Sequence, residues 1–231
     1  TIHDLIFLRF PQFYNPLDVL IYKTKIRHAC ERADRIVAIS KQTAEDVQSL
    51  LSTPADKIRV VYQGCHPNFK RTFTLQQLYA IKTAYRLPED FILYVGTIEP
   101  RKNALLILKA LTQLKTDIPL VLIGRATAYL KDIKKYADDN GLSNRVMYRH
   151  QVRFEDLPAI YQMAKVFVYP SFYEGFGIPL LEAIECQVPV ITSQGSCFQE
   201  AAGPDSLYVD PNNAEALAHQ IDNVLTDAVL R

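Results

Sequence analysis

The feature that most constrains the fold is a repeated alternation of short apolar runs with longer segments of helical periodicity. Runs such as Ile-Leu-Tyr-Val at 92–95 and Leu-Val-Leu-Ile at 120–123 are continuously apolar, as strands are when helices cover both faces of a sheet. Strands are expected at 35–39, 58–62, 91–95, 119–123, 145–148, 166–169, 188–192 and 206–209. Helices are expected near 41–51, 74–86, 103–115, 127–140, 154–164, 179–186 and 212–228. This order predicts an α/β fold with a Rossmann-like, doubly wound parallel sheet.

The segment 64–74, which contains proline and asparagine, is the best candidate for a domain boundary. It divides the chain into residues 1–67 and residues 68–231. The first piece holds too few strands for an α/β domain of its own, so we expect it to be the closing part of one. The second piece is long enough for a complete domain.

Charge and cysteine usage exclude several classes of protein. Lys and Arg number 26 and Asp and Glu 25, so the net charge is +1 and no broad positive field can attract a nucleic acid. Four cysteines lie far apart, without a Cys-x-x-Cys pair or a histidine at ligand spacing. We therefore expect reduced thiols, no metal site and a cytosolic protein. The longest apolar stretch, 118–123, is far shorter than the ~20 residues of a membrane helix.

The first motif lies at 170–182 and reads Pro-Ser-Phe-Tyr-Glu-Gly-Phe-Gly-Ile-Pro-Leu-Leu-Glu. In doubly wound sheets, ligands bind where strands end and helices begin. Two glycines here allow close approach of the backbone to a ligand, and the start of a helix offers unpaired N–H groups to a phosphate or a sugar. Glu174 falls in the loop and Glu182 about one turn into the helix. A tight turn with one solvated and one helix-stabilising glutamate fits the same spacing.

The second motif, Gly-Thr-Ile-Glu-Pro-Arg-Lys-Asn at 96–103, also follows a predicted strand. Two cations, Arg101 and Lys102, at the start of a helix oppose the helix dipole, unless an anion is held at the same place. An arginine fork and a lysine point charge would suit a diphosphate. Two solvated charges at a loop tip are the alternative.

Histidines give weaker signals. His3-Asp4 at the end of the opening run could contact a sugar or act in catalysis, although such a pair is more often structural. His28, His66, His150 and His219 show no partner pattern. The glycines do not match the fingerprints of P-loop NTPases or dinucleotide-dependent dehydrogenases.

Together these motifs resemble the retaining family-4 (group 1) glycosyltransferases with the GT-B fold, particularly bacterial mannosyltransferase-like members. Residues 173–183 match that family's Glu-x7-Glu motif, and 95–104 look like its phosphate-binding loop. Residues 189–193, with Glu200 downstream, match the next block. The segments at 3–5, 33–40 and 61–64 resemble the end of the N-terminal domain, so the similarity covers essentially the whole chain. It implies that residues 68–231 are the C-terminal, nucleotide-sugar-binding domain.

The resemblance also implies roles for individual residues. Glu174 and the backbone N–H groups that follow it would contact the donor sugar, Glu182 the ribose, and Lys102 with Arg101 the diphosphate, while His3 would reach toward the sugar. Thr97 stands where many members have arginine, so Arg101 would supply that cation. The expected catalytic residues are His3, Arg101, Lys102 and Glu174. The expected donor-binding residues are Gly96, Thr97, Arg101, Lys102, Gly175, Phe176, Gly177, Ile178 and Glu182.

The activity implied is transfer of a sugar from a nucleoside-diphosphate donor to a glycan or lipid-linked acceptor with retention of anomeric configuration. By the resemblance we expect mannose from a GDP donor. No cofactor or metal is expected, and peripheral membrane association would come from the part of the N-terminal domain before Thr1. The chain would be an inactive piece of a longer enzyme. Two alternatives stay open at this point: a nucleotide-sugar-binding module without transfer activity, and a hydrolysing nucleotide-sugar epimerase.

Overall fold

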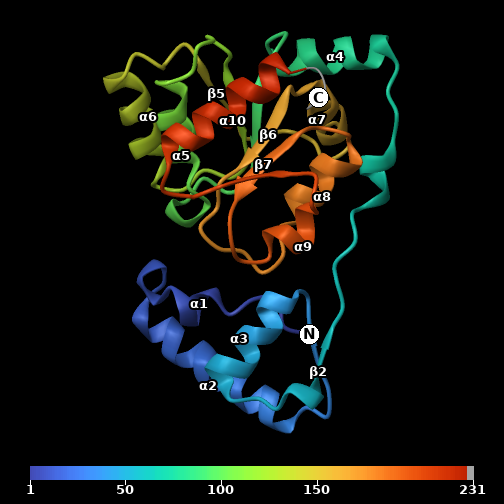
Figure 1. Ribbon diagram of the computed structural model, residues 1–231, viewed down its shortest axis with the longest axis vertical. Coiled ribbons are helices and arrows are strands. Elements are labelled where there is room, and N and C mark those ends of the chain that lie inside the picture. Colours follow the sequence, from blue (N-terminus) through green and yellow to red (C-terminus); the bar gives the residue numbers. More distant parts are fainter. Residues whose placement is uncertain (228–231) are drawn as a thin grey trace. The chain divides into compact units, whose positions relative to one another are not determined.

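The computed structural model of the chain describes residues 1–227. They form two compact units (Figure 1). Unit 1 consists of Thr1–Gly64, Tyr173–Gly177 and Gly195–Ala201, and unit 2 contains the remaining described residues. The chain therefore leaves unit 2 for unit 1 at two short segments late in the sequence. Each unit has its own sheet and its own helices.

Unit 2 is built on a parallel sheet of six strands in the order β5-β4-β3-β6-β7-β8. The strands are β3 (Ile92–Val95), β4 (Leu120–Ile123), β5 (Val146–Arg149), β6 (Val166–Tyr169), β7 (Val190–Ser193) and β8 (Leu207–Val209). Every residue of β4, β6 and β7 is buried. Both faces of the sheet must therefore be covered, as their continuously apolar sequences predict.

Helices supply that cover in two groups. The helix α10 packs against β6, β7, β8 and α5, and α5 packs against α6, whereas α8 packs against β6, β7 and α7, and α7 against α4. Figure 1 shows α5 and α10 on one side of the sheet and α7 and α8 on the other. The bounds are α4 (Leu75–Tyr85), α5 (Ala104–Leu111), α6 (Leu130–Asp139), α7 (Leu157–Met163), α8 (Ile178–Glu185) and α10 (Ala214–Thr226). Two 3-10 helices, η3 (Pro67–Lys70) and η4 (Pro100–Lys102), precede α4 and α5.

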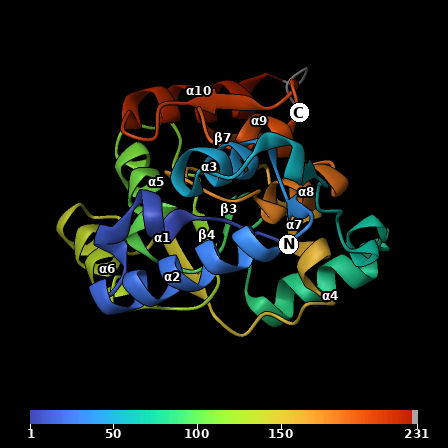
Figure 2. The same cartoon turned by 90° about the horizontal axis from the view of Figure 1, so that it is seen from below.

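Unit 1 is smaller and centres on two parallel strands, β1 (Ile36–Ala38) and β2 (Ile58–Val60). Its other elements are α1 (Ile6–Arg9), η1 (Pro11–Phe13), α2 (Pro16–Arg32), α3 (Lys41–Leu51), η2 (Ala55–Lys57) and α9 (Phe198–Ala202), whose last residue belongs to unit 2. Figure 2 shows α2 as the long helix beside α1, with which it is in contact. The apolar core joins the strands to the buried face of α3 through side chains such as Ile36, Val47 and Ile58.

The predicted α/β fold with a parallel sheet is confirmed, and all eight predicted strands and seven predicted helices are present, shorter by a few residues at several ends. Residue 228, the last of the helix expected near 212–228, lies outside the described residues. The sequence analysis missed α2. Only Cys30 of its 17 residues is buried, so the helix lacks the apolar stripe on which such predictions depend. No helix of residues 1–227 is long and apolar enough to span a membrane.

Candidate functional site

The topological switch point of unit 2 lies between β3 and β6. After β3 the chain adds β4 and β5 on one side of it, and β6, β7 and β8 then fill the other side. Loops that follow two such neighbouring strands run in opposite directions and leave a crevice at the carboxyl ends. The loops concerned are 96–102 and the residues from 170 onward. Both motifs singled out in the sequence therefore begin at this point of the sheet.

These loops are tied together by hydrogen bonds within unit 2. The backbone N–H of Phe172 donates to the carbonyl of Arg101 at 3.0 Å. The buried Asn103 donates from Nδ2 to the carbonyl oxygens of Pro170, at 3.0 Å, and Pro211, at 2.8 Å. Asn103 has a φ of 57°, a left-handed conformation that asparagine tolerates better than most residues. One side chain thus fixes the loops that follow β3, β6 and β8.

Two glycines let the loops after β3 and β4 lie close together. A Cβ atom at Gly124 would fall 2.0 Å from the carbonyl oxygen of Gly96, and the φ of Gly124 is +149°. Beyond this contact, the N–H of Ile98 donates to the carbonyl of Arg125 at 2.9 Å, and Thr127 Oγ1 donates to the carbonyl of Ile98 at 2.5 Å. Gly124 is therefore required by the close packing of two backbones.

The two cations of the second motif differ in their surroundings. Arg101 forms an ion pair with Glu99, with 2.7 Å between Nη2 and Oε1. Lys102 donates from Nζ to the hydroxyl of Tyr169 at 2.7 Å and lies 5.2 Å from the centre of that ring. Both cations lie in η4 and not on α5, which begins after Asn103. Since Tyr169 is the last residue of β6, Lys102 is held directly at the switch point.

A row of buried aromatic rings leads from Lys102 to Glu182. Tyr169 and Phe167 are two positions apart on β6, so they share one face of the sheet, with ring centres 5.9 Å apart. Phe167 lies 5.2 Å from the ring of Tyr161 on α7, and the hydroxyl of Tyr161 donates to Glu182 Oε2 at 2.9 Å. The sequence analysis did not identify Tyr161, Phe167 or Tyr169 as part of this arrangement.

The carboxylate of Glu182 is half-buried on α8. Burial raises its pKa, and the hydrogen bond from Tyr161 offsets only part of that effect. Within residues 1–227, no lysine or arginine forms an ion pair with this group. A further hydrogen-bond donor, such as the hydroxyl group of a ligand, would therefore stabilise the charged carboxylate of Glu182.

A pocket of about 520 Å³ lies at the carboxyl ends of β4 and β5. Its wall includes the side chains of Tyr148 and His150, whose rings are nearly parallel, 5.7 Å apart at an interplanar angle of 17°. The hydroxyl of Tyr148 donates to the carbonyl of Gly124 at 2.6 Å. His150 had no evident partner in the sequence. His150 lies two positions after Tyr148, and residues at this spacing in an extended chain point to the same side. This spacing is the feature of the sequence that could have identified it.

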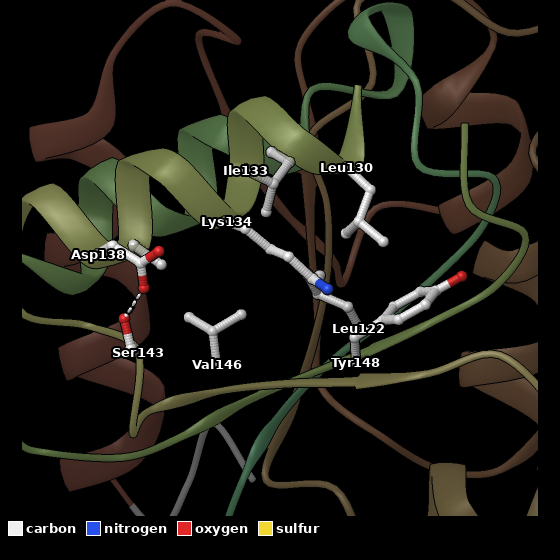
Figure 3. Close-up of a pocket in the computed structure, with 9 residues that line it drawn as sticks. Leu122, Leu130, Ile133, Lys134, Asp138, Ser143, Val146 and Tyr148 are labelled. Carbon is white, nitrogen blue, oxygen red and sulfur yellow. Dashed lines mark hydrogen bonds between the residues drawn. The ribbon is translucent and has the colours of Figure 1, made fainter. Parts of the chain in front are cut away.

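A second pocket, of about 230 Å³, lies between α6 and the strands β4 and β5 (Figure 3). It is lined mainly by apolar side chains such as Leu122, Ile133 and Val146, with Lys134 pointing across it. Tyr148 borders both pockets. None of the catalytic or donor-binding residues predicted from the sequence lines this second pocket.

In unit 1, the loop that carries Glu174 is held by residues 196–197. The hydroxyl of Ser196 donates to the carbonyl of Glu174 at 3.1 Å, and the thiol of Cys197 donates to the carbonyls of Glu174, at 3.2 Å, and Phe176, at 3.0 Å. Burial raises the pKa of the Cys197 thiol to about 12, so the thiol stays protonated and can donate. Glu174 itself is 8% exposed. The hydrogen bonds from Ser196 and Cys197 therefore hold this loop in place within unit 1.

Gly175 is needed because another part of the chain lies against it. A Cβ atom at this position would fall 2.1 Å from the carbonyl oxygen of His3. Thr43 Oγ1 also donates to the carbonyl of Gly175 at 3.2 Å. The structure therefore brings the backbone of His3 to the Glu174 loop, while the imidazole is exposed. Sequence reasoning had related this glycine to a ligand and not to His3.

Glu200, which the sequence analysis noted without a role, caps α3. Its carboxylate accepts the backbone N–H groups of Lys41, at 2.7 Å, and Gln42, at 3.1 Å. These are unpaired donors of the first turn, where a negative charge is favoured by the helix dipole. Glu200 thus stabilises unit 1.

The predicted site residues fall into two groups, one in each unit. Unit 1 holds His3, Glu174, Gly175, Phe176 and Gly177, and unit 2 holds Gly96, Thr97, Arg101, Lys102, Ile178 and Glu182. Their roles toward a ligand stay predictions. Within the described chain, no group of three or more His, Cys, Asp or Glu side chains is placed to hold a metal ion.

Comparison with known proteins identifies relatives along both units. The model of the family described as "Glycosyl transferases group 1" matches residues 79–231, and that of "Glycosyltransferase Family 4" matches residues 1–69. The chain is 33% identical over 233 residues to the O-antigen chain mannosyltransferase B of Escherichia coli, covering 98% of this chain and 61% of that protein. It is 26% identical to the O-antigen chain mannosyltransferase RfbU of Salmonella typhimurium, covering 100% and 62%. The chain thus spans about three fifths of these relatives.

Solved structures agree on the fold. The Anabaena protein HepE, crystallised with UDP and glucose, superimposes with a TM-score of 0.84 at 20% identity, covering 99% of this chain and 62% of that one. Sucrose-phosphate synthase from Thermosynechococcus elongatus gives a TM-score of 0.83 at 26% identity, covering 99% and 58%. The family model that matches residues 79–231 covers more than half of the chain, and both sequence motifs lie within that range. The chain therefore belongs to the group 1 family of glycosyltransferases.

Proposed function

We propose that the protein containing this chain transfers a mannosyl group from a nucleoside-diphosphate donor to a glycan or lipid-linked acceptor, with retention of anomeric configuration. Membership of the glycosyltransferase family supports the reaction class. Relatives named as O-antigen mannosyltransferases support the choice of sugar. A neighbour of the same fold crystallised with UDP and glucose supports the class of donor.

The observation that carries the proposal is the arrangement of Lys102 and Glu182 in unit 2. Lys102 lies at the switch point, where doubly wound sheets bind their ligands. Its ammonium group suits the diphosphate as a point charge, with Arg101 as the second cation. Glu182, at the far end of the row of aromatic rings, accepts hydrogen bonds from the ribose hydroxyls. Those donors would compensate the burial that raises the pKa of its carboxyl group.

The nucleobase is assigned to the pocket at the ends of β4 and β5. The parallel rings of Tyr148 and His150 offer a flat wall of the kind on which a base stacks. The pocket volume of about 520 Å³ is in the range of small-molecule sites. Guanine is the base we expect, because GDP is the donor nucleotide that the family resemblance suggests for mannose.

The transferred sugar is assigned to residues of unit 1 on the strength of the family motif. Glu174 would accept hydrogen bonds from the sugar hydroxyls, helped by the backbone N–H groups of Gly175 to Gly177, and His3 would contact the same sugar. Glu174 and Glu182 thus have different parts of the donor to recognise. Two carboxylates that divide the ligand in this way do not form the nucleophile and acid pair of a retaining glycosidase.

The chemistry then rests on orientation and electrostatics. The bond between the anomeric carbon and the diphosphate oxygen breaks, and the acceptor oxygen bonds to the same face of that carbon. The departing diphosphate takes the acceptor proton. Lys102 and Arg101 stabilise the charge that develops on the phosphates, and Glu174 with the backbone N–H groups after it orients the sugar. No metal ion is needed in this scheme.

The test is an assay of the complete protein against a panel of sugar nucleotides that includes GDP-mannose, UDP-glucose and UDP-galactose. We expect transfer from one mannose nucleotide to a glycan or lipid-linked acceptor, with the anomeric configuration kept in the product. Binding of a sugar nucleotide without transfer would favour a binding module. Release of free sugar and an epimerised product would favour a hydrolysing epimerase. Either outcome would overturn the proposal.

A further inference from the structure

Tyr173, the residue before Glu174, is held on several sides within unit 1. Its hydroxyl donates to Asp46 Oδ2 at 2.6 Å. The guanidinium carbon of Arg9 lies 5.5 Å from the centre of its ring, and the ring of Phe10 lies 5.4 Å away. The side chain is 8% exposed. Both its ring and its hydroxyl therefore have specific partners.

Asp46 is the central group of this cluster. It lies on α3 and is 1% exposed. Its Oδ1 atom accepts from Arg9 Nε at 2.8 Å and from Arg9 Nη2 at 2.6 Å, while Oδ2 accepts from Tyr173. A buried carboxylate persists only when its charge is paired and hydrogen-bonded. Arg9 supplies the charge and Tyr173 the bond to Oδ2, so the three side chains form one cluster.

The titration of Tyr173 fits this arrangement. Burial and the negative charge of Asp46 raise the pKa of the phenol well above its ordinary value. The hydroxyl therefore keeps its proton and remains a donor to the carboxylate across the range in which proteins are studied.

The backbone that follows Tyr173 is fixed residue by residue. The carbonyl of Glu174 accepts from Ser196 and Cys197, that of Gly175 from Thr43, and that of Phe176 from Cys197. These bonds hold the main chain from the carbonyl of Glu174 onward. The side-chain contacts of Tyr173 fix the backbone just before Glu174, which is the first residue of the Glu-x7-Glu motif.

We infer that Asp46 and Arg9 are positioning residues that act on Glu174 through Tyr173, and that they determine how well the transferred sugar is held. This inference rests on the proposed function, in which Glu174 contacts the sugar. The proposed nucleotide-binding residues Lys102 and Glu182 belong to unit 2, whereas Arg9, Asp46 and Tyr173 belong to unit 1. The cluster therefore affects recognition of the sugar and leaves recognition of the nucleotide unchanged.

The test compares two affinities in the complete protein: that for the free nucleoside diphosphate and that for the corresponding sugar nucleotide. Tyr173→Phe removes the hydroxyl and keeps the ring. We expect the free diphosphate to bind as in the wild type, the extra affinity due to the sugar to fall about tenfold, and kcat to fall roughly 10- to 100-fold. Tyr79→Phe is the matched control, because it removes the same atom from an exposed side chain on α4.

A second variant tests the coupling. Asp46→Asn weakens the ion pair with Arg9 and the bond to Tyr173 together. If the cluster acts as a unit, adding Tyr173→Phe to Asp46→Asn should cause little further loss of sugar-dependent affinity, whereas independent effects would multiply. A merely structural role would lower the Tm and weaken binding of the diphosphate and the sugar nucleotide alike.

The outcomes separate this inference from the proposed function. If wild-type protein binds no sugar nucleotide more tightly than the free diphosphate, the assignment of Glu174 fails and the inference fails with it. If wild-type protein shows that preference and Tyr173→Phe retains it in full, as Tyr79→Phe does, only the inference is overturned. Loss of the sugar preference in Tyr173→Phe, with diphosphate affinity retained, supports both.

Discussion

Replacing Glu182 by Gln should weaken nucleotide binding without weakening the fold. Glutamine keeps the size of the side chain and an oxygen that can accept from the hydroxyl of Tyr161, now 2.9 Å from Oε2. The negative charge is lost, however, and with it the strength of the bonds from the ribose hydroxyls. A hydrogen bond to a charged group contributes about 1.5–3 kcal/mol, so loss of roughly 2 kcal/mol would weaken binding about 30-fold.

The stability of the ligand-free protein should change in the opposite direction. Burial raises the pKa of Glu182, which means that the folded state disfavours the charged carboxylate. A group whose pKa is raised by folding contributes stability that is fully present below its pKa in the unfolded chain. That stability is lost as the pH rises through its pKa in the folded protein. Glu182→Gln removes that loss, so at neutral pH the Tm of the variant should equal or exceed that of the wild type. Below the pKa of this glutamate in the unfolded chain, where the wild type is neutral in both states, the difference should vanish.

Calorimetric titration with the free nucleoside diphosphate and thermal unfolding across a pH series measure the two effects. Glu185→Gln on the same helix is the control, because Glu185 is exposed and forms only a 3.8 Å ion pair with Lys70. It should leave nucleotide affinity unchanged. The reasoning is refuted if Glu182→Gln binds the diphosphate like the wild type, or if it lowers the Tm at neutral pH more than the control does.

Three other outcomes are expected. Lys102→Ala should lower kcat by a factor on the order of 10²–10³, as loss of one transition-state donor does. Lys109→Ala changes an exposed side chain on α5 and should leave kcat unchanged. Equal kcat values in both variants would exclude Lys102 from the site. Gly124→Ala places a methyl group 2.0 Å from the carbonyl of Gly96, which should cost about 3 kcal/mol and lower the Tm by roughly 6–12 °C. Gly64→Ala meets nothing within 4 Å and should leave the Tm unchanged. Activity should survive EDTA, and its loss on chelation with recovery on adding magnesium or manganese would contradict the metal-free scheme.

The strands could be predicted because burial on both faces of a sheet leaves a direct mark on the sequence. Every position of β4 and β6 must be apolar, whichever face it points to. Helices with a buried face, such as α3, were found for a similar reason. The helix α2 was not, although Asn15 caps it and Pro16 begins it, since a helix that buries one residue in 17 shows no periodicity.

The family motifs could also be recognised in the sequence. A ligand that is bound by a loop and by the helix after it requires a set spacing between the residues that contact it. The spacing of Glu174 and Glu182 and the pair Arg101-Lys102 were therefore visible. Sequence alone could not place the partners of these residues. Tyr161 lies 21 positions from Glu182, and Tyr169 lies 67 from Lys102.

Only the tertiary structure decided which residues support the Glu174 loop. Asp46 and Tyr173 are 127 positions apart, and nothing in the sequence around Asp46 distinguishes it from a solvated residue on an amphipathic helix. Gly175 looked like a ligand-facing glycine until the carbonyl of His3 was found beside it. The sequence by itself determined the periodicity and the motif spacing, since both depend on neighbours along the chain. The buried contacts of Asp46, Tyr173 and Gly175 depend on neighbours across the fold, which the order of residues does not reveal.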